Sequence, residues 1–347
     1  MATDTDPALS SPAIRWDRER LRLLDQRLLP AETRYVECVT ANEVADAIRS
    51  MVVRGAPAIG IAAAYGAALA VRMHGRQSDA LKIDLETLAN ARPTAVNLVW
   101  ALNRVRPLVD EGADFESVAA AAEAIHAEDI ETNRTLAQLG SEYLKTGSRV
   151  LTHCNTGPLA TGGVGTALGV IVSAWREERI ASVHFTETRP WMQGARLTAW
   201  ELSQAGVPAT LVTESAAGGL ALSGAFDWLI VGADRVAANG DVVNKVGTAP
   251  LAALIRDGGG RVMVVAPFST VDLDLSSGAE VPIEQRAGEE VWRAADAGEL
   301  PAGIAIDNPA FDITPASQVD FLVTEQRVIS PARGERPGVS KRGGMVK

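Results

Sequence analysis

Short apolar runs recur along the second half of the chain at intervals that suit strands separated by helices. They occupy residues 149–153, 181–187, 209–214, 227–233, 261–267 and 319–325. Helix-like or loop segments alternate with them. Because this alternation is typical of βαβ units, the pattern predicts a Rossmann-like, mainly parallel, doubly wound sheet.

The first half has longer apolar stretches at helical spacing. Residues 12–40 mix short apolar pairs with charges, which predicts two or three strands. Helices are expected over 41–53, after the glycine turn at Arg54, after Pro93 and Thr94, and over 115–144. We therefore expect an α/β protein, with a small, mostly helical N-terminal domain that has a few strands. The predicted parts are a flexible tail (1–12), the N-terminal domain (13–126), a Rossmann-like domain (127–332) and a second flexible tail (333–347).

Composition and charge narrow the class of protein. The 347 residues include 33 Lys and Arg against 43 Asp and Glu, and the net charge of −10 argues against non-specific binding to nucleic acid or anionic membranes. The apolar run 56–71 is shorter than a membrane span and rich in Ala and Gly, so we expect a buried helix. The N-terminus lacks a signal-peptide pattern. Two cysteines, Cys38 and Cys154, make no disulfide framework, which favours a cytoplasmic location, and the scattered histidines give no zinc pattern.

A glycine-rich turn follows the first predicted strand of the sheet. Gly163, Gly165 and Gly169 form G-x-G-x-x-x-G, which is one residue longer than the dinucleotide fingerprint, and Glu187 ends the next strand about where a ribose-binding acid would lie. Three interpretations stay open here: a nicotinamide enzyme, another phosphate-bearing ligand held by backbone N–H groups, or a tight turn without a ligand.

Two arginines precede predicted helix starts. Arg54 comes directly before Gly55 and Ala56, and Arg92 comes before a Pro-Thr pair. A helix N-terminus favours an anion, and guanidinium binds phosphate with two parallel hydrogen bonds. The pair could therefore clamp a phosphate, although each arginine could instead form an ion pair with a carboxylate.

Polar residues also follow the predicted strands, at the edge of the sheet where ligands bind in such folds. Asp234 comes after one strand, and Asn244 and Lys245 follow it beyond a predicted hairpin turn. Apolar surroundings would raise the pKa of Asp234 and suit it to carry a proton, whereas pairing with Arg235 or Lys245 would lower that pKa and make the residue structural. Gln193 could bind sugar hydroxyls or cap a turn.

The segment LTHCNTG, residues 151–157, puts Cys154 where the first strand of the sheet meets the glycine turn. If the segment is extended, His153 and Cys154 point to opposite faces, so they do not form a nucleophilic pair and a papain-like hydrolase is not supported. Cys154 could supply a polarisable group or a thiol proton within a site, or be an inert buried cysteine.

Five segments together carry a specific resemblance: RGAPAIG, RPTAVN, LTHCNTG, ETRPWMQGARLTAWEL and GADRVAANGDVVNKVGT. In order and spacing they closely resemble the methylthioribose-1-phosphate isomerases, methionine-salvage enzymes related to the regulatory subunits of the translation factor eIF2B. The resemblance extends from about residue 14 to about residue 330.

The resemblance implies an activity and a site. The family converts 5-methylthioribose 1-phosphate, an aldose, to the ketose 5-methylthioribulose 1-phosphate, without a metal or a nicotinamide cofactor. It implies a homodimer that binds a small sugar phosphate, in keeping with the cytoplasmic location favoured by the cysteines and with the charge that argues against binding to nucleic acid or membrane. Cys154 and Asp234 match the catalytic positions. The substrate-binding positions are matched by Arg54, Gly55, Ala56, Arg92, Gln193, Asn244 and Lys245.

Three alternatives remain. The substrate could be another sugar 1-phosphate, such as 5-deoxyribose 1-phosphate or ribose 1,5-bisphosphate. The chain could be a non-catalytic regulatory subunit of a translation factor, although the presence of Cys154, Asp234 and both arginines argues against this. A nicotinamide dehydrogenase is disfavoured because the glycine spacing is one residue too long.

Overall fold

The structure is a computed structural model that describes residues 11–76, 78–92, 96–293 and 298–338. The chain divides into two compact units, and neither is a single stretch of sequence. Unit 1 comprises the residues up to Thr135 together with Thr156–Gly165 and Ser203–Ala205. Unit 2 comprises Leu136–Asn155, Thr166–Leu202 and the residues from Gly206 onward. The boundary between the units therefore lies within the longest helix.

Unit 1 combines a small antiparallel sheet with a group of helices, as predicted. The strands are β1 (Ile14–Trp16), β2 (Leu21–Leu24) and β3 (Tyr35–Cys38). The helices are α1 (Ala41–Arg49), α2 (Ala56–His74), α3 (Asp79–Ala89), α4 (Val96–Asp110) and α5 (Phe115–Ser141). A capping box of Thr40 and Glu43 starts α1. The predicted helix start at Pro93 and Thr94 lies outside the described residues.

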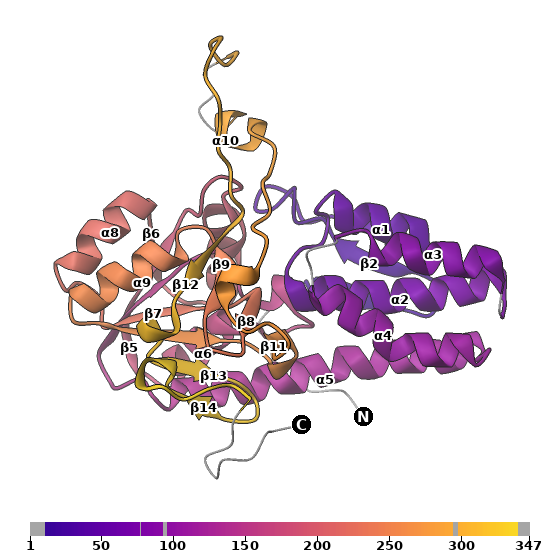
Figure 1. Cartoon of the computed structure of the whole chain (residues 1–347), viewed down its shortest axis with the longest axis horizontal. Coiled ribbons are helices and arrows are strands. Elements are labelled where there is room, and N and C mark those ends of the chain that lie inside the picture. The colour runs from indigo at the N-terminus through magenta and orange to yellow at the C-terminus, as the bar shows by residue number, and fades with distance from the viewer. Residues whose placement is uncertain (1–10, 77, 93–95, 294–297, 339–347) are drawn as a thin grey trace. The chain divides into compact units, whose positions relative to one another are not determined.

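Helix α2 forms the centre of unit 1. By length and composition it could cross a membrane, but 78% of its apolar window is buried inside the unit. It packs along α4 and also contacts α1 and α3, whose labels surround it in Figure 1. The expectation of a buried helix in this stretch is therefore confirmed.

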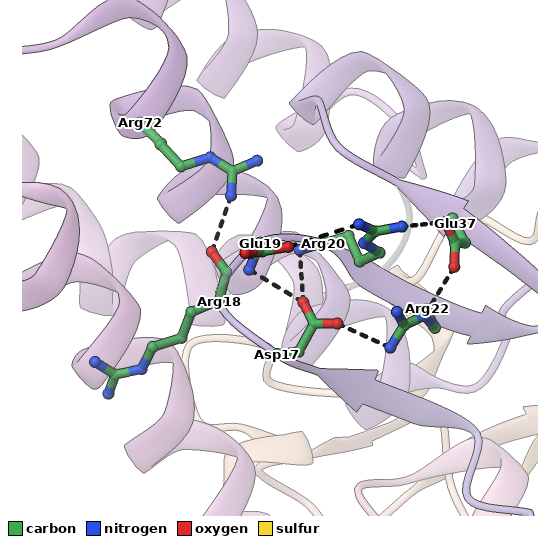
Figure 2. Close-up of polar contacts among 7 residues, drawn as sticks. All are labelled: Asp17, Arg18, Glu19, Arg20, Arg22, Glu37 and Arg72. Carbon is green, nitrogen blue, oxygen red and sulfur yellow. Dashed lines mark hydrogen bonds and ion pairs between the residues drawn. The ribbon is translucent and has the colours of Figure 1, made fainter.

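The turn between β1 and β2 is held by polar contacts that Figure 2 shows. The Asp17 carboxylate accepts the backbone N–H groups of Glu19 and Arg20, at 3.1 and 2.9 Å. Arg72 of α2 donates to the backbone oxygen of Arg18 at 2.9 Å. The turn is thereby tied to the central helix of its own unit, although its side chains are exposed.

Unit 2 is built on a seven-stranded sheet in the order β14–β13–β10–β7–β4–β5–β6. All neighbouring pairs are parallel except β13 with β14. The strands are β4 (Ser148–Thr152), β5 (Ile180–Thr186), β6 (Ala209–Val212), β7 (Trp228–Val231), β10 (Arg261–Val265), β13 (Phe321–Val323) and β14 (Val328–Ile329). Each of the six predicted runs overlaps one of the parallel strands, which confirms the mainly parallel sheet.

Helices complete the core of unit 2. They are α6 (Ala167–Arg176), α7 (Ala199–Gln204), α8 (Glu214–Leu222), α9 (Thr248–Asp257) and the short α10 (Glu289–Arg293). Helices α8 and α9 lie side by side in Figure 1, and their buried residues join those of the central strands in one apolar cluster. Single helical turns occupy Pro158–Ala160, Gly194–Thr198, Phe268–Thr270, Gly278–Glu280, Ala316–Gln318 and Pro331–Arg333.

A second, four-stranded sheet was only partly predicted. Its order is β11–β8–β9–β12, with β8 (Arg235–Ala237), β9 (Val242–Lys245), β11 (Val271–Asp272) and β12 (Phe311–Thr314). The hairpin of β8 and β9 is the one that the turn sequence predicts. Strands β11 and β12 join it from distant parts of the chain.

The predicted C-terminal tail is partly wrong. The Arg336 guanidinium donates to the backbone oxygen of Asn239, and Arg327 donates to the backbone oxygen of Arg336 at 3.2 Å. Residues 333–338 are thus held against unit 2 instead of hanging free. Residues 339–347 lie outside the described part of the chain.

Candidate active site

Three adjacent strands of the large sheet end beside the residues predicted to act. Strand β4 lies between β7 and β5. Cys154 follows the end of β4, Asp234 follows the end of β7, and Gln193 lies in the segment after β5. Because carboxyl ends of neighbouring parallel strands share one edge, unit 2 carries these three residues on the edge where such sheets bind ligands.

Cys154 has a backbone conformation that differs from the prediction. The strand ends at Thr152, and Cys154 has φ +68°, so the segment is not extended there. Its N–H donates to Thr188 Oγ1 at 3.0 Å, and its backbone oxygen accepts from Thr198 Oγ1 at 2.7 Å. The side chain is 6% exposed. Two threonines from the next segment of chain therefore fix this turn.

His153 does not serve Cys154 as a base, although the reason differs from the predicted one. Its Nδ1 lies 2.6 Å from Thr186 Oγ1, and its Nε2 lies 2.9 Å from the backbone oxygen of Val246. Both ring nitrogens are engaged away from the thiol. The conclusion that no Cys–His pair exists stands on these contacts.

Asp234 is positioned by the small sheet. Its N–H donates to the backbone oxygen of Val243 at 3.0 Å, which continues the pairing of β8 with β9. The neighbouring Arg235 lies 3.7 Å from Asp272, so the predicted alternative in which Arg235 neutralises Asp234 loses support. The Asp234 side chain is half-buried at the start of the hairpin.

Asn244 and Lys245 end strand β9 and are both buried. Asn244 Nδ2 donates to Thr248 Oγ1 at 3.1 Å, at the first residue of α9. Lys245 is only 9% exposed, and its Nζ donates to the backbone oxygen of Ala310 at 2.9 Å. The same ammonium lies 4.7 Å from the centre of the Phe311 ring. Strand β9 thus ends with a buried positive charge, and a buried charge needs polar or charged partners.

Gln193 has an acceptor that the described residues leave unbonded. Its side chain is buried, and none of the described residues donates a hydrogen bond to Oε1. A buried amide oxygen without a donor costs free energy, so such an atom commonly faces a ligand or water. This fits the predicted hydrogen bond to a sugar hydroxyl.

Arg54, Gly55 and Ala56 lie in unit 1, at the start of α2. Gly55 precedes the helix with φ +96°, and a Cβ built on it would lie 2.5 Å from the backbone oxygen of Ala160. Only glycine permits this approach. The start of α2 is thus packed against the helical turn Pro158–Ala160, which follows Cys154 in the chain.

Arg92 also lies in unit 1, shortly before α4. A Cβ built on Gly60 of α2 would lie 2.7 Å from the backbone oxygen of Asn97 in α4. The first turns of the two helices that follow Arg54 and Arg92 are therefore in close contact. This juxtaposition is what a shared phosphate clamp requires.

The glycine turn does not present its N–H groups to a ligand. The N–H of Gly162 donates to Asp129 Oδ2 at 2.6 Å, and the N–H groups of Gly163 and Gly165 donate to Thr161 Oγ1 at 3.3 and 3.0 Å. These donors are used within unit 1, one by a carboxyl group and two by a hydroxyl group. The argument for a nicotinamide dinucleotide or another anion at this turn is therefore lost.

His126 and Asp129, both on α5, hold the glycine turn. His126 Nε2 lies 2.8 Å from the backbone oxygen of Gly162, and Tyr65 reaches His126 Nδ1 at 3.0 Å. Burial lowers the pKa of His126 and raises that of Asp129 to about 6. Burial thus favours the neutral form of both side chains, His126 and Asp129, that hold the turn.

Sequence reasoning missed the residues that support the site. Thr188 and Thr198 hold the backbone of Cys154, and Asp312 of β12 accepts the N–H groups of Gly247 and Ala249 at 2.7 and 3.1 Å. Burial raises the pKa of Asp312 to about 6. The polar residues that follow β5 and lie in β12 were the available signal, but their partners are distant in sequence.

The described residues include no cluster of three His, Cys, Asp or Glu side chains that could hold a metal ion. Cys38 and Cys154 are both free and buried. Burial raises the pKa of the Cys38 thiol to about 12, which leaves it an inert core residue.

The chain belongs to the initiation factor 2 subunit family, whose model matches residues 52–331. Within this family it is similar to a methylthioribose-1-phosphate isomerase from Alkalilimnicola ehrlichii. The two sequences are 53% identical over 93% of this chain and 95% of the relative. The family resemblance found in the sequence is thus confirmed.

Two solved structures share the fold. The 5-methylthioribose 1-phosphate isomerase from Pyrococcus horikoshii has a TM-score of 0.86 and 38% identity, over 95% of each chain. A protein from A. fulgidus, described as translation initiation factor eIF-2B subunit delta, has a TM-score of 0.81 and 40% identity, over 93% of this chain and 96% of the other.

Proposed function

We propose that the protein is a methylthioribose-1-phosphate isomerase, which converts 5-methylthioribose 1-phosphate to 5-methylthioribulose 1-phosphate. The observation that carries the proposal is the edge of the large sheet in unit 2. Cys154 and Asp234 follow adjacent parallel strands there, and Asp234 starts the hairpin that ends with Asn244 and Lys245. The similarity to isomerases over nearly the whole chain supports the same activity.

The reaction needs one group that gives and takes protons. Asp234 donates a proton to the ring oxygen, the bond from that oxygen to C1 breaks, and the phosphate stays on C1. The hydrogen on C2 then moves to C1, the C2 hydroxyl loses its proton to Asp234, and C2 becomes the ketone. C1 is reduced and C2 is oxidised, so no external electron acceptor is needed and Asp234 ends in its starting form.

The hydrogen travels from C2 to C1 by one of two routes. In a proton route, Asp234 removes it from C2 and returns it to C1, while the Cys154 thiol stabilises the transition state. In a hydride route it moves directly, and Asp234 handles only hydroxyl protons. Deuterium from D₂O at C1 of the product would exclude the hydride route.

The remaining site residues bind the substrate in this proposal. Arg54 and Arg92, with the helix start at Gly55 and Ala56, hold the phosphate and oppose its loss. Gln193 and Asn244 bind the sugar hydroxyls, and Lys245 contributes a buried positive charge. A water-excluding site slows the competing elimination of phosphate.

The deciding experiment is turnover of the purified protein, with EDTA and without NAD, followed by NMR. The substrates are 5-methylthioribose 1-phosphate, 5-deoxyribose 1-phosphate and ribose 1,5-bisphosphate. We expect ketose formation with the highest kcat/KM on the methylthio sugar. A preference for another sugar would reassign the substrate. No ketose from a folded protein would favour the non-catalytic regulatory subunit that the A. fulgidus similarity raises.

The proposed enzyme is a cytoplasmic homodimer that binds neither nucleic acid nor membrane. The homodimer rests on the family resemblance, and the lack of nucleic-acid binding on the net charge of −10. Sedimentation equilibrium tests the oligomeric state, and a monomer at micromolar concentration would overturn that part.

A further inference from the structure

A chain of buried side chains connects the Cys154 backbone to the turn that follows β9. Cys154 N–H donates to Thr188 Oγ1 at 3.0 Å, and that hydroxyl lies 2.9 Å from Thr186 Oγ1. Thr186 Oγ1 lies 2.6 Å from His153 Nδ1, and His153 Nε2 lies 2.9 Å from the Val246 backbone oxygen. The two threonines and the histidine are completely buried. All of these groups belong to unit 2.

The direction of every hydrogen bond in the chain is determined. A backbone oxygen only accepts, so His153 Nε2 carries the proton that bonds Val246. Burial lowers the pKa of His153 to about 4, and the nearby Lys245 charge acts in the same direction, so the ring is neutral and Nδ1 accepts. Thr186 therefore donates its hydroxyl proton to Nδ1.

The orientation of the Thr188 hydroxyl follows from that of the Thr186 hydroxyl. Because Thr186 has given its proton to His153, its oxygen accepts from the Thr188 hydroxyl. Thr188 could also donate to the Thr186 backbone oxygen at 3.3 Å, but two hydroxyl oxygens 2.9 Å apart would then share no proton. Thr188 Oγ1 completes the chain by accepting the Cys154 N–H.

The backbone at both ends of this contact is held in a costly conformation. Cys154 has φ +68° and Thr188 has φ +63°. For a β-branched residue such as threonine this region is a genuine outlier, so a residue without a branch would fit more easily. What the threonine supplies at this position is its hydroxyl, which contacts Cys154.

The other edge of the histidine ring is packed just as closely. A Cβ built on Gly247 would lie 3.0 Å from His153 Cε1, and Gly247 has φ +103°. The ring thus lies flush against the turn that joins β9 to α9. Asn244 and Lys245 end β9 directly before this turn.

We propose that His153 is a positioning residue, which acts in its neutral Nε2–H tautomer through Thr186 and Thr188. One edge of the ring fixes the left-handed backbone of Cys154, and the other fixes the turn that follows Asn244 and Lys245. The thiol and the buried ammonium are thereby held in one frame. This inference rests on the proposed function, because the roles of Cys154 and Lys245 belong to it.

The main test compares Thr188→Val with Thr188→Ser. Valine keeps the shape of threonine but cannot accept the Cys154 N–H, whereas serine keeps the hydroxyl and loses the methyl group. We expect Thr188→Val to lower kcat roughly 100-fold with little change in KM, as for a misplaced reacting group. Thr188→Ser should stay close to wild type in kcat.

A second readout needs no substrate. Iodoacetamide alkylation of Cys154, followed by mass spectrometry of its peptide, should be faster in Thr188→Val than in wild type, because the turn that buries the thiol is loosened. The Cys154→Ser variant is the control, because any alkylation that remains in it comes from Cys38. Equal alkylation rates in the valine variant and wild type would overturn the proposal whether or not the protein turns over sugar phosphates. A wild type without turnover would instead count against the proposed function.

The variants His153→Asn and His153→Gln test the hydrogen bonds at the two edges of the ring one at a time. An asparagine amide reaches about as far as Nδ1 and keeps an acceptor for Thr186, while a glutamine amide reaches about as far as Nε2 and keeps a donor for Val246. We expect the glutamine variant to lose mainly kcat and the asparagine variant to raise mainly KM. Equal losses in both parameters in both variants, or a damaged Thr188→Ser, would mean that these residues only pack, which would overturn the proposal.

Discussion

The backbone of Cys154 adopts φ +68°, a region that costs a non-glycine residue of order 1 kcal/mol or more unless the surroundings hold it there. Here the holding groups are Thr188 and Thr198, which lie 34 and 44 positions further along the chain. The sequence locates Cys154 at a strand end because strand patterns are local. It does not reveal the left-handed turn, because the hydroxyls that determine the turn come from distant segments.

Asp234 illustrates the same limit. The apolar run before it predicts its place at the carboxyl edge of the sheet, as the structure confirms. The sequence could not decide between a carrier of protons and a structural partner of Arg235 or Lys245. The Arg235 alternative depends on Asp272, which reaches the hairpin through the parallel pairing of β11 with β8.

At this position we predict that Asp234→Asn keeps the fold and the binding of substrate but loses turnover. The amide cannot donate and recover a proton, and removal of such a group lowers kcat by about 10²–10⁴-fold. Steady-state kinetics by NMR, with substrate binding by calorimetry, measures both effects. Asp257→Asn, which changes an exposed carboxylate at the end of α9, is the matched control. Wild-type kcat in Asp234→Asn would remove Asp234 from the mechanism.

At the scale of elements, the long parallel strands were predictable and the small sheet was not. Strands β7 and β10 consist mostly of buried apolar residues, and β4 and β5 also contain several, which is a strong local signal. Strands β8, β9, β11 and β12 have two to four residues each, and β12 pairs with β9 across 66 to 72 positions. Such short strands have no periodicity to detect, so only the hairpin turn predicted any part of this sheet.

The start of α2 offers a test of how one element positions another. We predict that Gly55→Ala destabilises the protein by about 2–4 kcal/mol, because the new Cβ would lie 2.5 Å from Ala160 and the backbone has φ +96°. Urea unfolding measures the change in the free energy of unfolding.

Gly75 gives a matched control at the other end of the same helix. It has φ +69°, but no atom lies within 4 Å of a Cβ built there. Gly75→Ala should therefore show only the backbone cost of about 1 kcal/mol. Equal losses in the free energy of unfolding for the two variants would refute the prediction, because the close approach to Ala160 would then contribute nothing.

At the scale of the whole molecule, each unit buries a carboxyl group whose pKa is raised to about 6, Asp129 in unit 1 and Asp312 in unit 2. Burial is the main cause in both. The folded protein keeps these protons at pH values where the unfolded chain, with an ordinary value of 3.8, has released them. Each group therefore makes stability fall as the pH rises through that interval.

We predict that the stability of wild type relative to Asp129→Asn decreases as the pH rises from about 4 to about 6, and is constant above this interval. Asparagine does not titrate, so the difference isolates this carboxyl group. Urea unfolding at a series of pH values measures it. Asp114→Asn is the control. Hydrogen bonds from Ser117 lower the pKa of Asp114, so the stability of wild type relative to this variant should rise with pH. A difference for Asp129 that rises with pH would contradict the prediction.

The allocation of residues between units could not be predicted from composition. A linear reading assigns contiguous domains, whereas residues 156–165 and 203–205 fold with unit 1 although the sequence around them folds with unit 2. The reason is physical. Leu159 is completely buried in unit 1, and its backbone oxygen accepts from Gln26 at 2.7 Å, a contact made across 133 positions.

This crossing of the chain between Asn155 and Thr156 limits how the gene can be divided. A fragment that ends at residue 135 would lack the strip of chain around Leu159 that completes its own interior, and a fragment that begins there would carry that strip with nowhere to bury it. Neither unit is therefore expected to fold when the chain is cut at this boundary. Exchange of one unit for a foreign module would need a junction between Asn155 and Thr156, one residue beyond Cys154, whereas insertions in exposed loops leave both interiors intact.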